Sequence, residues 1–525
     1  MIRLRMVYCG LILVLLGGVI GGCRASPKQA EQPTYWPAGE WRISTPEEQG
    51  LDSGLILAML DKIQNDNLAI HSILIARHGY LVTEVYFPPY QQGIRHPAYS
   101  MTKSFTSAMV GKALQEGYIK SIHQKVLEFF PDIAQDTTDP RREDITIEHL
   151  LTMSAGYNTN TMPDLYSKDA SFDTIRHILT YNSVLVPPGT SFYYDSGLPH
   201  LLSAVIQKNA GMTLQDYAKQ NLFQPLGITD YTWESDPKGI TNGATGLTLR
   251  PRDMAKFGYL FLHHGEWNGT QLLPAEWVEA STSKHIETKG LMNAAEEDGY
   301  GYLWWIDSFG GYSAHGFGGQ YVFVLPLLDM VVVFTSGLPE SLFPMPNQLV
   351  RNYLIPAAKE DGPLIPHSQV PQWLADRVRA IEQGEPHDSV LPEIARRITG
   401  KTFRADQIPP GGMYVAFTLT FTGEGTYQNK IQFPGGQTIL VTGSLNQAFH
   451  LNQVRFPGPP AQDLLIPLRG YWQDEVTFVE DYIQNLNTDI DLMTNKYTFE
   501  GDKVIIETSS RMSDDSFQMV WEMVK

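Results

Sequence analysis

The chain has 525 residues, of which 39 are Lys or Arg and 57 are Asp or Glu, so its formal net charge is −18 at pH 7. With 42% hydrophobic residues, the composition is that of a folded globular protein and excludes a disordered chain. The acidic balance repels phosphate backbones, and no run of five or more basic residues occurs, so nucleic-acid binding is not expected.

The N-terminus has the pattern of a secretory signal. Basic residues precede an apolar run over residues 11–16, and small residues then lead to Cys23. The segment Ile20-Gly21-Gly22-Cys23 resembles a bacterial lipobox, whose cysteine is diacylated and starts the mature protein; an uncleaved anchor and an ordinary cleaved signal are the alternatives. We expect a signal peptide over 1–22, a lipidated tether over 23–35, and an exported protein anchored to the membrane of the bacterial cell envelope.

The next part of the chain, residues 36–358, mixes strand and helix periodicities. It predicts a β-hairpin (73–77 and 81–86), a helix (104–117) and, after a mostly helical middle, two buried strands (321–325 and 330–334). This order of elements favours an α+β domain in which helices cover one antiparallel sheet, with a helical subdomain in its middle.

The C-terminal part differs in character. Glycine and prolines between Pro356 and Pro371 interrupt regular structure, so we expect a linker over residues 359–398. From Thr399 onward, alternating apolar and polar residues are separated by turn pairs such as Pro434-Gly435. This pattern predicts a smaller all-β domain over 399–525, either a sandwich or a barrel.

The sequence contains three Ser-x-x-Lys tetrads, which begin at Ser100, Ser235 and Ser281. Pro237 opposes a helix in the second, and the third lies in a polar stretch, whereas Ser100 opens an apolar helix. Residues three apart share a helix face, so the Lys103 amine can reach the Ser100 hydroxyl. A buried amine favours its neutral form, which can take the serine proton. A helix with a surface serine and lysine would show the same tetrad.

The segments around Ser100 resemble the serine β-lactamase-like superfamily, which includes class C β-lactamases, D,D-peptidases, esterases and 6-aminohexanoate-oligomer hydrolases. The resemblance rests on collinear segments that together cover about residues 36–358: 72–79, 99–107, 145–156, 188–192, 223–227 and 252–258. The resemblance implies the β-lactamase/transpeptidase-like fold, with Ser100 as the nucleophile and Lys103 as its base.

The second motif of the superfamily is Tyr-x-Asn, or Tyr-x-Ser in some esterase-like members. Tyr194-Asp195-Ser196 occupies its place, so the resemblance implies that Tyr194 shuttles protons beside the lysine and that Ser196 faces the substrate. A phenolate-like oxygen near a cationic lysine is a reasonable general base, because opposite charge lowers its pKa. Tyr193 is the alternative to Tyr194, and core packing is the alternative role for both.

The third motif, Lys-Thr-Gly on an edge strand, falls on Ala314-His315-Gly316, and its lysine is missing. In proteins that recognise β-lactams this cation helps to hold a carboxylate. Its absence therefore disfavours recognition of penicillins and of the C-terminal carboxylate of peptidoglycan peptides. The resemblance implies an oxyanion hole from the N–H groups of Ser100 and Phe317, because Gly316 lets a substrate approach the backbone. His315, Gly316 and Trp305 are expected to contact the substrate.

Several other chemistries lack a signature, because no P-loop, HExxH motif, CxxC pair or EF-hand loop occurs. We therefore expect neither a cofactor nor a metal site. Asp253 is expected to be structural, either pairing with Arg252 or capping a helix. The C-terminal domain resembles the lipocalin-like β domain of some superfamily members through residues 468–478.

Together, these observations predict a lipid-anchored serine hydrolase that cleaves small esters or linear amides through an acyl-enzyme on Ser100. The esterase and 6-aminohexanoate-oligomer hydrolase branch is favoured by Tyr-x-Ser, by Gly-Phe-Gly-Gly-Gln after His315 and by the Trp304-Trp305 pair. One alternative is a penicillin-binding D,D-peptidase or β-lactamase. Another is a non-catalytic envelope binding protein built on a hydrolase scaffold.

Overall fold

The computed structural model describes residues 35–136, 139–162, 171–181, 183–288, 297–366, 369–384, 390–405, 414–422, 425–446, 448–457, 461–513 and 516–524. These residues form an α+β domain, residues 35–384, and a barrel domain, residues 390–524. The predicted signal peptide and lipidated tether, with Cys23, lie outside the described residues, apart from Tyr35. Among the described residues, no helix is both long and apolar enough to cross a bilayer.

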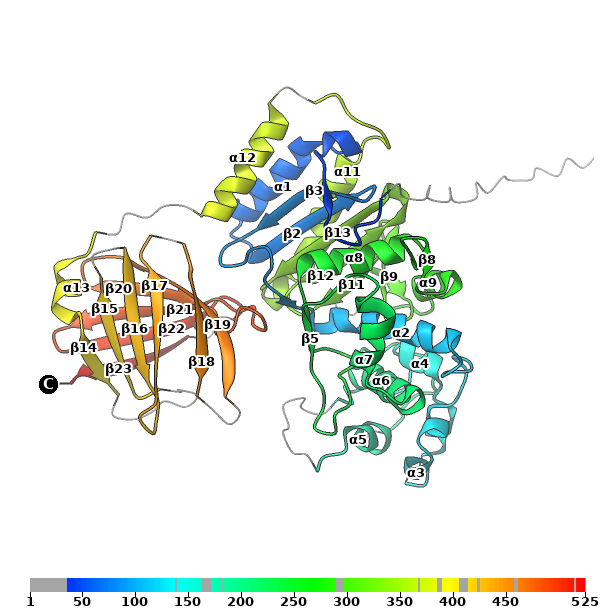
Figure 1. Cartoon of the computed structure of the whole chain (residues 1–525). Helices are drawn as coiled ribbons and strands as arrows, with labels where there is room; N and C mark the ends of the chain where they lie inside the picture. The colour runs from blue at the N-terminus through cyan, green and yellow to red at the C-terminus, as the bar shows by residue number, and fades with distance from the viewer. Residues whose placement is uncertain are drawn as a thin grey trace, which may run out of the picture. The chain divides into compact units, whose positions relative to one another are not determined.

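The α+β domain is built on an eight-stranded sheet with the order β1-β3-β2-β13-β12-β11-β10-β9 (Figure 1). Its strands are β1 (Arg42–Ile43), β2 (Ile70–Arg77), β3 (Tyr80–Tyr86), β9 (Glu297–Tyr300), β10 (Trp305–Asp307), β11 (Gly311–Gly316), β12 (Gln320–Leu325) and β13 (Met330–Ser336). Except for the parallel β1–β3 pair, all neighbours are antiparallel. The predicted antiparallel sheet is therefore confirmed, and the first and last parts of the domain both contribute strands to it.

The predicted hairpin is formed by β2 and β3, and its turn shows why the sequence folds there. His78 and Gly79 have φ angles of 50° and 82°. Two successive residues with positive φ make the turn whose twist matches that of the flanking strands. The turn therefore pairs β3 with β2, which pairs with β13 on its other side and has all eight of its residues buried.

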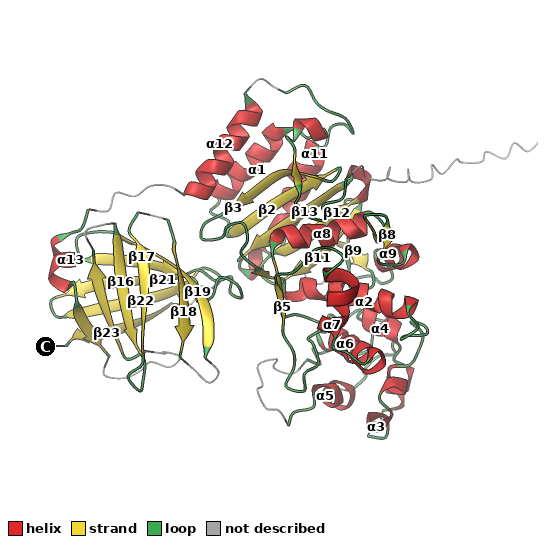
Figure 2. Ribbon diagram, viewed as in Figure 1, coloured by secondary structure: helices red, strands yellow, loops and turns green. Residues whose placement is uncertain are grey.

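Helices cover both faces of this sheet, so alternate residues of its central strands enter two separate cores (Figure 2). Leu74 and Ala76 of β2 pack in the core that holds α2 and α8, while Ile73 and Ile75 pack in the core that holds α1 and α12. The helices of these two layers are α1 (Ser53–Asn65), α2 (Thr102–Gln115), α8 (Pro251–Leu262), α11 (Ile355–Ala357) and α12 (Val370–Gln383). Continuous apolar strands are what a sheet buried on both faces requires.

A helical subdomain is inserted between β3 and β9, as the sequence predicts. It contains α3 (Pro131–Ala134), α4 (Ile147–Leu151), α5 (Thr174–Thr180), α6 (Gly197–Ala210), α7 (Leu214–Ala218) and α9 (Ala275–Ser281), with the short strands β4 (His96–Pro97), β5 (Tyr231–Trp233), β6 (Leu247–Leu249), β7 (Glu266–Trp267) and β8 (Thr270–Gln271). A further short helix, α10 (Met345–Leu349), follows β13. The predicted 104–117 helix corresponds to α2, after which Gly117 adopts a φ of 77°. Helix α2 is buried along most of its length, which holds its first turn in one position.

The expected linker, residues 359–398, is wrong in its extent, because it contains two helices. Pro371 lies in the first turn of α12, where proline loses no helical hydrogen bond, so it starts this helix instead of breaking it. Leu374 of α12 packs in the core beside α1. The second helix, α13 (Glu393–Ile398), places Ile394 and Ile398 in the core of the barrel domain. Both domains therefore extend further than their predicted boundaries.

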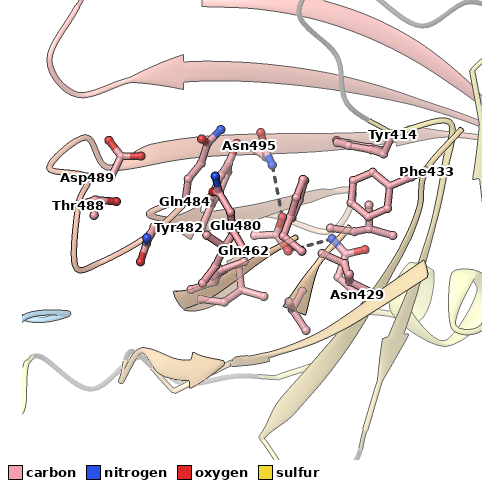
Figure 3. Close-up of a pocket in the computed structure, with 18 of the residues that line it drawn as sticks. Tyr414, Asn429, Phe433, Gln462, Glu480, Tyr482, Gln484, Thr488, Asp489 and Asn495 are labelled. Carbon is pink, nitrogen blue, oxygen red and sulfur yellow. Dashed lines mark hydrogen bonds between the residues drawn. The ribbon is translucent and has the colours of Figure 1, made fainter. Parts of the chain in front are cut away.

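The C-terminal domain is a barrel, one of the two architectures that the sequence predicts. Its strands are β14 (Lys401–Arg404), β15 (Ala416–Phe421), β16 (Thr426–Gln432), β17 (Thr438–Ser444), β18 (His450–Phe456), β19 (Gln462–Trp472), β20 (Thr477–Tyr482), β21 (Met493–Glu500), β22 (Lys503–Ser510) and β23 (Ser516–Met523). A parallel bridge between Ser444 of β17 and Arg469 of β19 closes nine of them into a barrel, and β18 pairs with β19 beside this closure. The barrel interior is lined by residues such as Tyr414, Phe433 and Glu480 (Figure 3).

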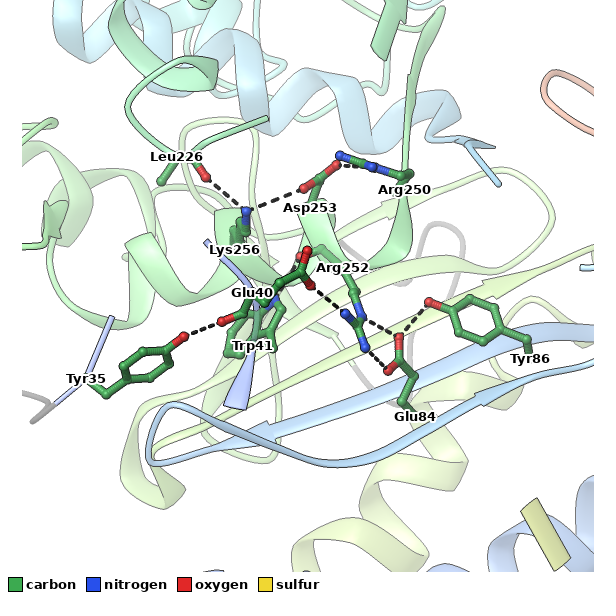
Figure 4. Close-up of polar contacts among 10 residues, drawn as sticks. All are labelled: Tyr35, Glu40, Trp41, Glu84, Tyr86, Leu226, Arg250, Arg252, Asp253 and Lys256. Atoms are coloured by element: carbon green, nitrogen blue, oxygen red, sulfur yellow. Dashed lines mark hydrogen bonds and ion pairs between the residues drawn. The ribbon is translucent and has the colours of Figure 1, made fainter. Parts of the chain in front are cut away.

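The polar network at the start of α8 corrects the predicted partner of Asp253 (Figure 4). Asp253 pairs with Arg250 at 2.9 Å and with Lys256 at 3.8 Å. Arg252 instead forms two bonds to Glu84 of β3, at 2.8 and 2.7 Å. Successive residues on a helix face different directions, whereas residues three apart are neighbours, so Asp253 cannot share a face with Arg252.

Candidate active site

Ser100 lies in a short turn, the 3-10 helix η2 (Tyr99–Met101), which leads directly into α2. Tyr99 has a φ of 46°, and the left-handed region is unfavourable for a bulky residue. Such backbone strain persists only where surrounding structure holds it, and it concentrates at functional sites. Here the buried helix α2 on one side and strand β11 on the other hold the turn, and they fix the position of the serine.

The predicted pair of Ser100 and Lys103 is brought into direct contact. The Lys103 Nζ lies 2.9 Å from the Ser100 Oγ, 3.1 Å from the carbonyl oxygen of Ala244 and 3.3 Å from the Oγ of Ser196. Ser196 precedes α6 and Ala244 precedes β6, so three separate segments converge on one amine. The arrangement supplies a lysine nitrogen with hydroxyl partners on two sides.

Burial changes the acid–base behaviour of this lysine. Lys103 is 1% exposed, and desolvation of its ammonium lowers its pKa from 10.5 to about 7, partly opposed by the charge of Asp195. A large share of the amine is therefore neutral near pH 7. A neutral amine 2.9 Å from a hydroxyl can accept the proton that the serine must lose to become a nucleophile.

The ring of Tyr194 lies beside the Lys103 amine. The Lys103 Nζ lies 4.8 Å from the centre of the Tyr194 ring, which itself stacks on Trp305 at 5.7 Å. Of the two tyrosines that the sequence leaves open, Tyr194 is therefore the one whose ring contacts the lysine. Tyr193 uses its backbone N–H to bond the Met153 carbonyl at 2.8 Å.

Gly316 brings the end of β11 against the nucleophile's turn. A Cβ atom at this position would lie 2.3 Å from the Ala98 carbonyl oxygen and 3.0 Å from the Ser100 nitrogen, so a larger residue does not fit. The backbone that continues to Phe317 consequently runs beside the Ser100 amide, and the Phe317 ring contacts Tyr99 at 5.6 Å. This close approach is what an oxyanion hole from the two predicted N–H groups requires.

Comparison with known proteins agrees with this fold. Residues 67–353 match the family model described as Beta-lactamase, a span of more than half the chain. The chain belongs to the Beta-lactamase family. It is therefore related to the serine hydrolases of that superfamily, as the resemblance in its sequence implies.

Individual relatives are distant. The 6-aminohexanoate-dimer hydrolase of Paenarthrobacter ureafaciens is 25% identical over 299 residues, which cover 51% of this chain and 73% of that protein. A β-lactamase of Escherichia coli is 28% identical over 138 residues, which cover 26% of this chain and 34% of that protein. The structure of an octameric penicillin-binding protein homologue from Pyrococcus abyssi superposes with a TM-score of 0.48 at 18% identity, over 90% of this chain and all of the other.

His315 and Ala314 stand where the resemblance in the sequence is expected to place the third motif. His315 is buried with its ring edge-on to Trp305 at 4.6 Å, and burial, together with the charge of Lys103, lowers its pKa to about 3. Ala314 is buried in the core. The imidazole is therefore neutral at pH 7, so neither residue supplies the positive charge of a lysine at this point.

The structure also shows site residues that the sequence did not reveal. Asp195 is 1% exposed, and its Oδ1 accepts hydrogen bonds from the backbone and hydroxyl of Thr161 and from the Gly197 N–H, at 2.8 to 3.0 Å. Burial raises its pKa to about 6 in spite of these bonds. Asn160 accepts from the Ser196 N–H at 3.1 Å. The position of Asp195 between Tyr194 and Ser196 could have indicated a role in the site. Nothing in the sequence around Asn160 indicates that it contacts Ser196.

The other two tetrads do not form comparable pairs. Ser281 donates its hydroxyl to the Val278 carbonyl at 3.1 Å, and Lys284 pairs with Glu287 at 2.9 Å on the surface. Ser235 forms an isolated bridge with Thr241 in a loop region. Within the described residues, no group of three or more His, Cys, Asp or Glu side chains is placed to hold a metal ion.

Proposed function

We propose that this Beta-lactamase-family protein hydrolyses small esters or linear amides through an acyl-enzyme on Ser100. The observation that carries the proposal is the 2.9 Å contact between the Ser100 hydroxyl and a buried lysine whose pKa is lowered to about 7. This contact also opposes a purely binding role, which would be favoured by a site in which the lysine could not reach the serine.

In the first half of the reaction, neutral Lys103 takes the Ser100 proton as the Oγ attacks the substrate carbonyl. A C–O bond forms, and the carbonyl oxygen becomes an oxyanion that the N–H groups of Ser100 and Phe317 stabilise. The C–O or C–N bond of the leaving group then breaks. Its alcohol or amine takes a proton through Tyr194 from the lysine, which leaves an ester of Ser100.

In the second half, water replaces the leaving group. Lys103 and Tyr194 take a proton from the water as its oxygen attacks the acyl carbonyl, and the same two N–H groups hold the new oxyanion. The ester bond to Ser100 then breaks, the Oγ regains a proton, and the acid leaves. No step uses a metal or a cofactor.

The walls of the site support the proposed substrate class. The third-motif position carries Ala314 and a neutral His315, so a substrate carboxylate would find no cation there. Aromatic rings of Trp305 and Tyr194 form an apolar wall beside the lysine. These features favour a neutral ester or amide over a penicillin, and the named activity of the Paenarthrobacter relative supports an amide substrate.

The test is hydrolysis of p-nitrophenyl butyrate and of nitrocefin by a soluble form that begins at Ser26. Ser100→Ala is expected to lower kcat/KM for the ester by about 10³-fold or more, since it removes the nucleophile. Ser235→Ala, which alters a different Ser-x-x-Lys tetrad, is the matched control and is expected to keep full activity. Retained activity in Ser100→Ala would contradict the mechanism. A nitrocefin rate that rivals the ester rate would favour a β-lactamase or D,D-peptidase.

We further propose that the protein is exported and held at the envelope membrane by lipid on Cys23. The lipobox-like segment before Cys23 and the polar stretch after it support this proposal. Incorporation of labelled fatty acid into the chain, with Cys23→Ser as control, is the test. Equal labelling of both forms would contradict it.

A further inference from the structure

The barrel domain contains a cavity of about 330 Å³ that the proposed hydrolysis does not use (Figure 3). Its apolar wall is formed by Ile431, Phe433, Ile439, Val441, Leu464 and Ile466. On β17, Ile439 and Val441 are buried while the residue between them, Leu440, is exposed, so the strand alternates between inside and outside. The volume is within the range of sites that bind small molecules.

A single carboxyl group lies at the polar centre of this cavity. Glu480 of β20 is 3% exposed, and its two oxygens accept four hydrogen bonds. Tyr427 and Asn429 donate to Oε1 at 3.0 and 3.3 Å, and Tyr497 and Asn495 donate to Oε2 at 2.7 and 3.3 Å. These donors come from strands β16 and β21, so the barrel wall fixes the carboxyl group in place.

The polar centre has one hydrogen-bond acceptor without a donor and no nearby cation among the described lining residues. The Oδ1 atom of Asn429 is buried without a hydrogen-bond partner among the described residues, while its Nδ2 is held by Glu480. No Lys, Arg or His is among the described residues that line the cavity, and a second carboxyl, Asp489, also lines it. Burial disfavours the charged form of Glu480 and raises its pKa, and no cation among the described lining residues offsets this effect. The cavity thus offers acceptors and negative charge, and it needs a donor.

We propose that this cavity binds a small amphiphile with a primary amine at one end and an unbranched apolar body. An ammonium N–H bonds the open Asn429 Oδ1, the positive charge of the head group compensates the Glu480 carboxylate beside it, and the apolar body lies against the wall of β16, β17 and β19. A ligand cation compensates a buried carboxylate, and filling the open acceptor removes the cost of an unpaired buried polar atom. A carboxylate head would place like charges together and leave the acceptor unpaired.

The first test uses three ligands with the same eight-carbon tail. The full chain is titrated by calorimetry with octylamine, octanol and octanoate, each below its micellar concentration. Octylamine is expected to bind most tightly and octanoate most weakly, with a difference on the order of tenfold or more between them. Octanoate binding as tight as octylamine binding would overturn the proposal, and so would an absence of binding by all three.

The second test places the ligand in the cavity with two neighbouring substitutions on β17. Ile439→Trp fills the cavity, because Ile439 is 8% exposed and lines it, whereas Leu440→Trp alters the outer surface, where Leu440 is 54% exposed. Octylamine binding is expected to be lost in Ile439→Trp and kept in Leu440→Trp. Unchanged binding in Ile439→Trp would overturn the proposal. Circular dichroism and urea denaturation of both variants serve as the check that the barrel domain is folded in each.

A third variant tests the head group. Glu480→Gln removes the charge while keeping the side-chain shape, so octylamine affinity is expected to fall about tenfold and octanol affinity less than about threefold. Equal losses for the two ligands would contradict the role of the carboxylate charge. If this variant does not fold, the ligand series and the β17 pair still decide the proposal.

Discussion

In each domain a buried ionisable group, Lys103 or Glu480, lies at the centre of a polar cluster, but the two groups have different partners. Lys103 contacts two serine hydroxyls and one carbonyl, and burial lowers its pKa to about 7. Glu480 accepts four hydrogen bonds from Tyr and Asn side chains on strands β16 and β21. The neutral amine of Lys103 can accept a proton from the serine hydroxyl beside it, whereas two tyrosine hydroxyls and two amides donate hydrogen bonds that hold the Glu480 carboxyl group in place. The partners of a buried charge therefore indicate whether it is placed for proton transfer or for binding.

The comparison predicts that substituting Lys103 affects activity far more than stability. Lys103→Met is expected to lower kcat for p-nitrophenyl butyrate by about 10³-fold or more, because the serine loses its base. The melting temperature is expected to stay the same or to rise, since a buried amine with a lowered pKa opposes folding at neutral pH. Steady-state kinetics and thermal denaturation measure the two effects.

The matched control is a second buried lysine outside the site. Lys256 is 4% exposed, donates to the Leu226 carbonyl at 3.1 Å and lies 3.8 Å from Asp253. Lys256→Met is expected to keep kcat near the unsubstituted value and to lose about 1–3 kcal/mol of stability, because it leaves a buried acceptor and a buried carboxylate less well paired. Equal inactivation by both substitutions would mean that loss of any buried lysine disrupts the fold.

The expected pH dependence follows from the same lysine. Because Lys103 must be neutral to accept a proton, activity is expected to rise with pH through about 7, the value to which burial lowers its pKa. The charge of Asp195 raises that pKa, so Asp195→Asn is expected to lower it and to move the acidic limb of the profile to lower pH, by roughly one unit. The side-chain oxygen of asparagine can still accept the bonds from Thr161 and Gly197.

The profile of kcat/KM between about pH 5 and pH 9 tests this shift. Asp253→Asn is the control, because Asp253 is also a buried carboxyl group but pairs with Arg250, which precedes α8, and with Lys256 of α8. Its profile is expected to match that of the unsubstituted protein. A limb that moves to higher pH in Asp195→Asn, or that moves equally in both variants, would show that Asp195 does not set the lysine pKa.

The sequence was most informative where local pattern and tertiary structure agree. The β2–β3 hairpin and the pair of Ser100 and Lys103 follow from spacing along the chain, because turns and helix faces are set by neighbouring residues. The sequence prediction does not include the start of α12, because it treats Pro371 as a helix breaker. Proline is in fact favoured in the first turn of a helix.

Features that depend on distant segments could not be predicted in this way. The contact of Lys103 with Ala244 joins residues 141 positions apart. The bridge between Ser444 and Arg469 that closes the barrel depends on how far the sheet curls, which alternation along one strand does not specify. The four donors around Glu480 come from strands before and after it in the sequence. Such sites become visible only when the chain is folded.

Substitution of Glu480 is expected to have the smallest effect on hydrolysis, in contrast to substitution of Lys103. Glu480→Gln is expected to leave kcat for the ester unchanged, because the carboxyl group takes no part in the proposed reaction. It is expected to lower the stability of the barrel domain by about 1–3 kcal/mol, since a glutamine cannot accept from all four donors.

Urea denaturation followed by the fluorescence of the barrel tryptophans measures this loss, with Glu507→Gln on the neighbouring strand β22 as control. Glu507 is half-buried between inward-facing residues, so its substitution is expected to change stability by less than about 0.5 kcal/mol. A strong loss of esterase activity in Glu480→Gln, with the α+β domain still folded, would mean that the barrel cluster acts in the reaction. The two buried charges would then belong to one functional unit and could not be separated as proton transfer and binding.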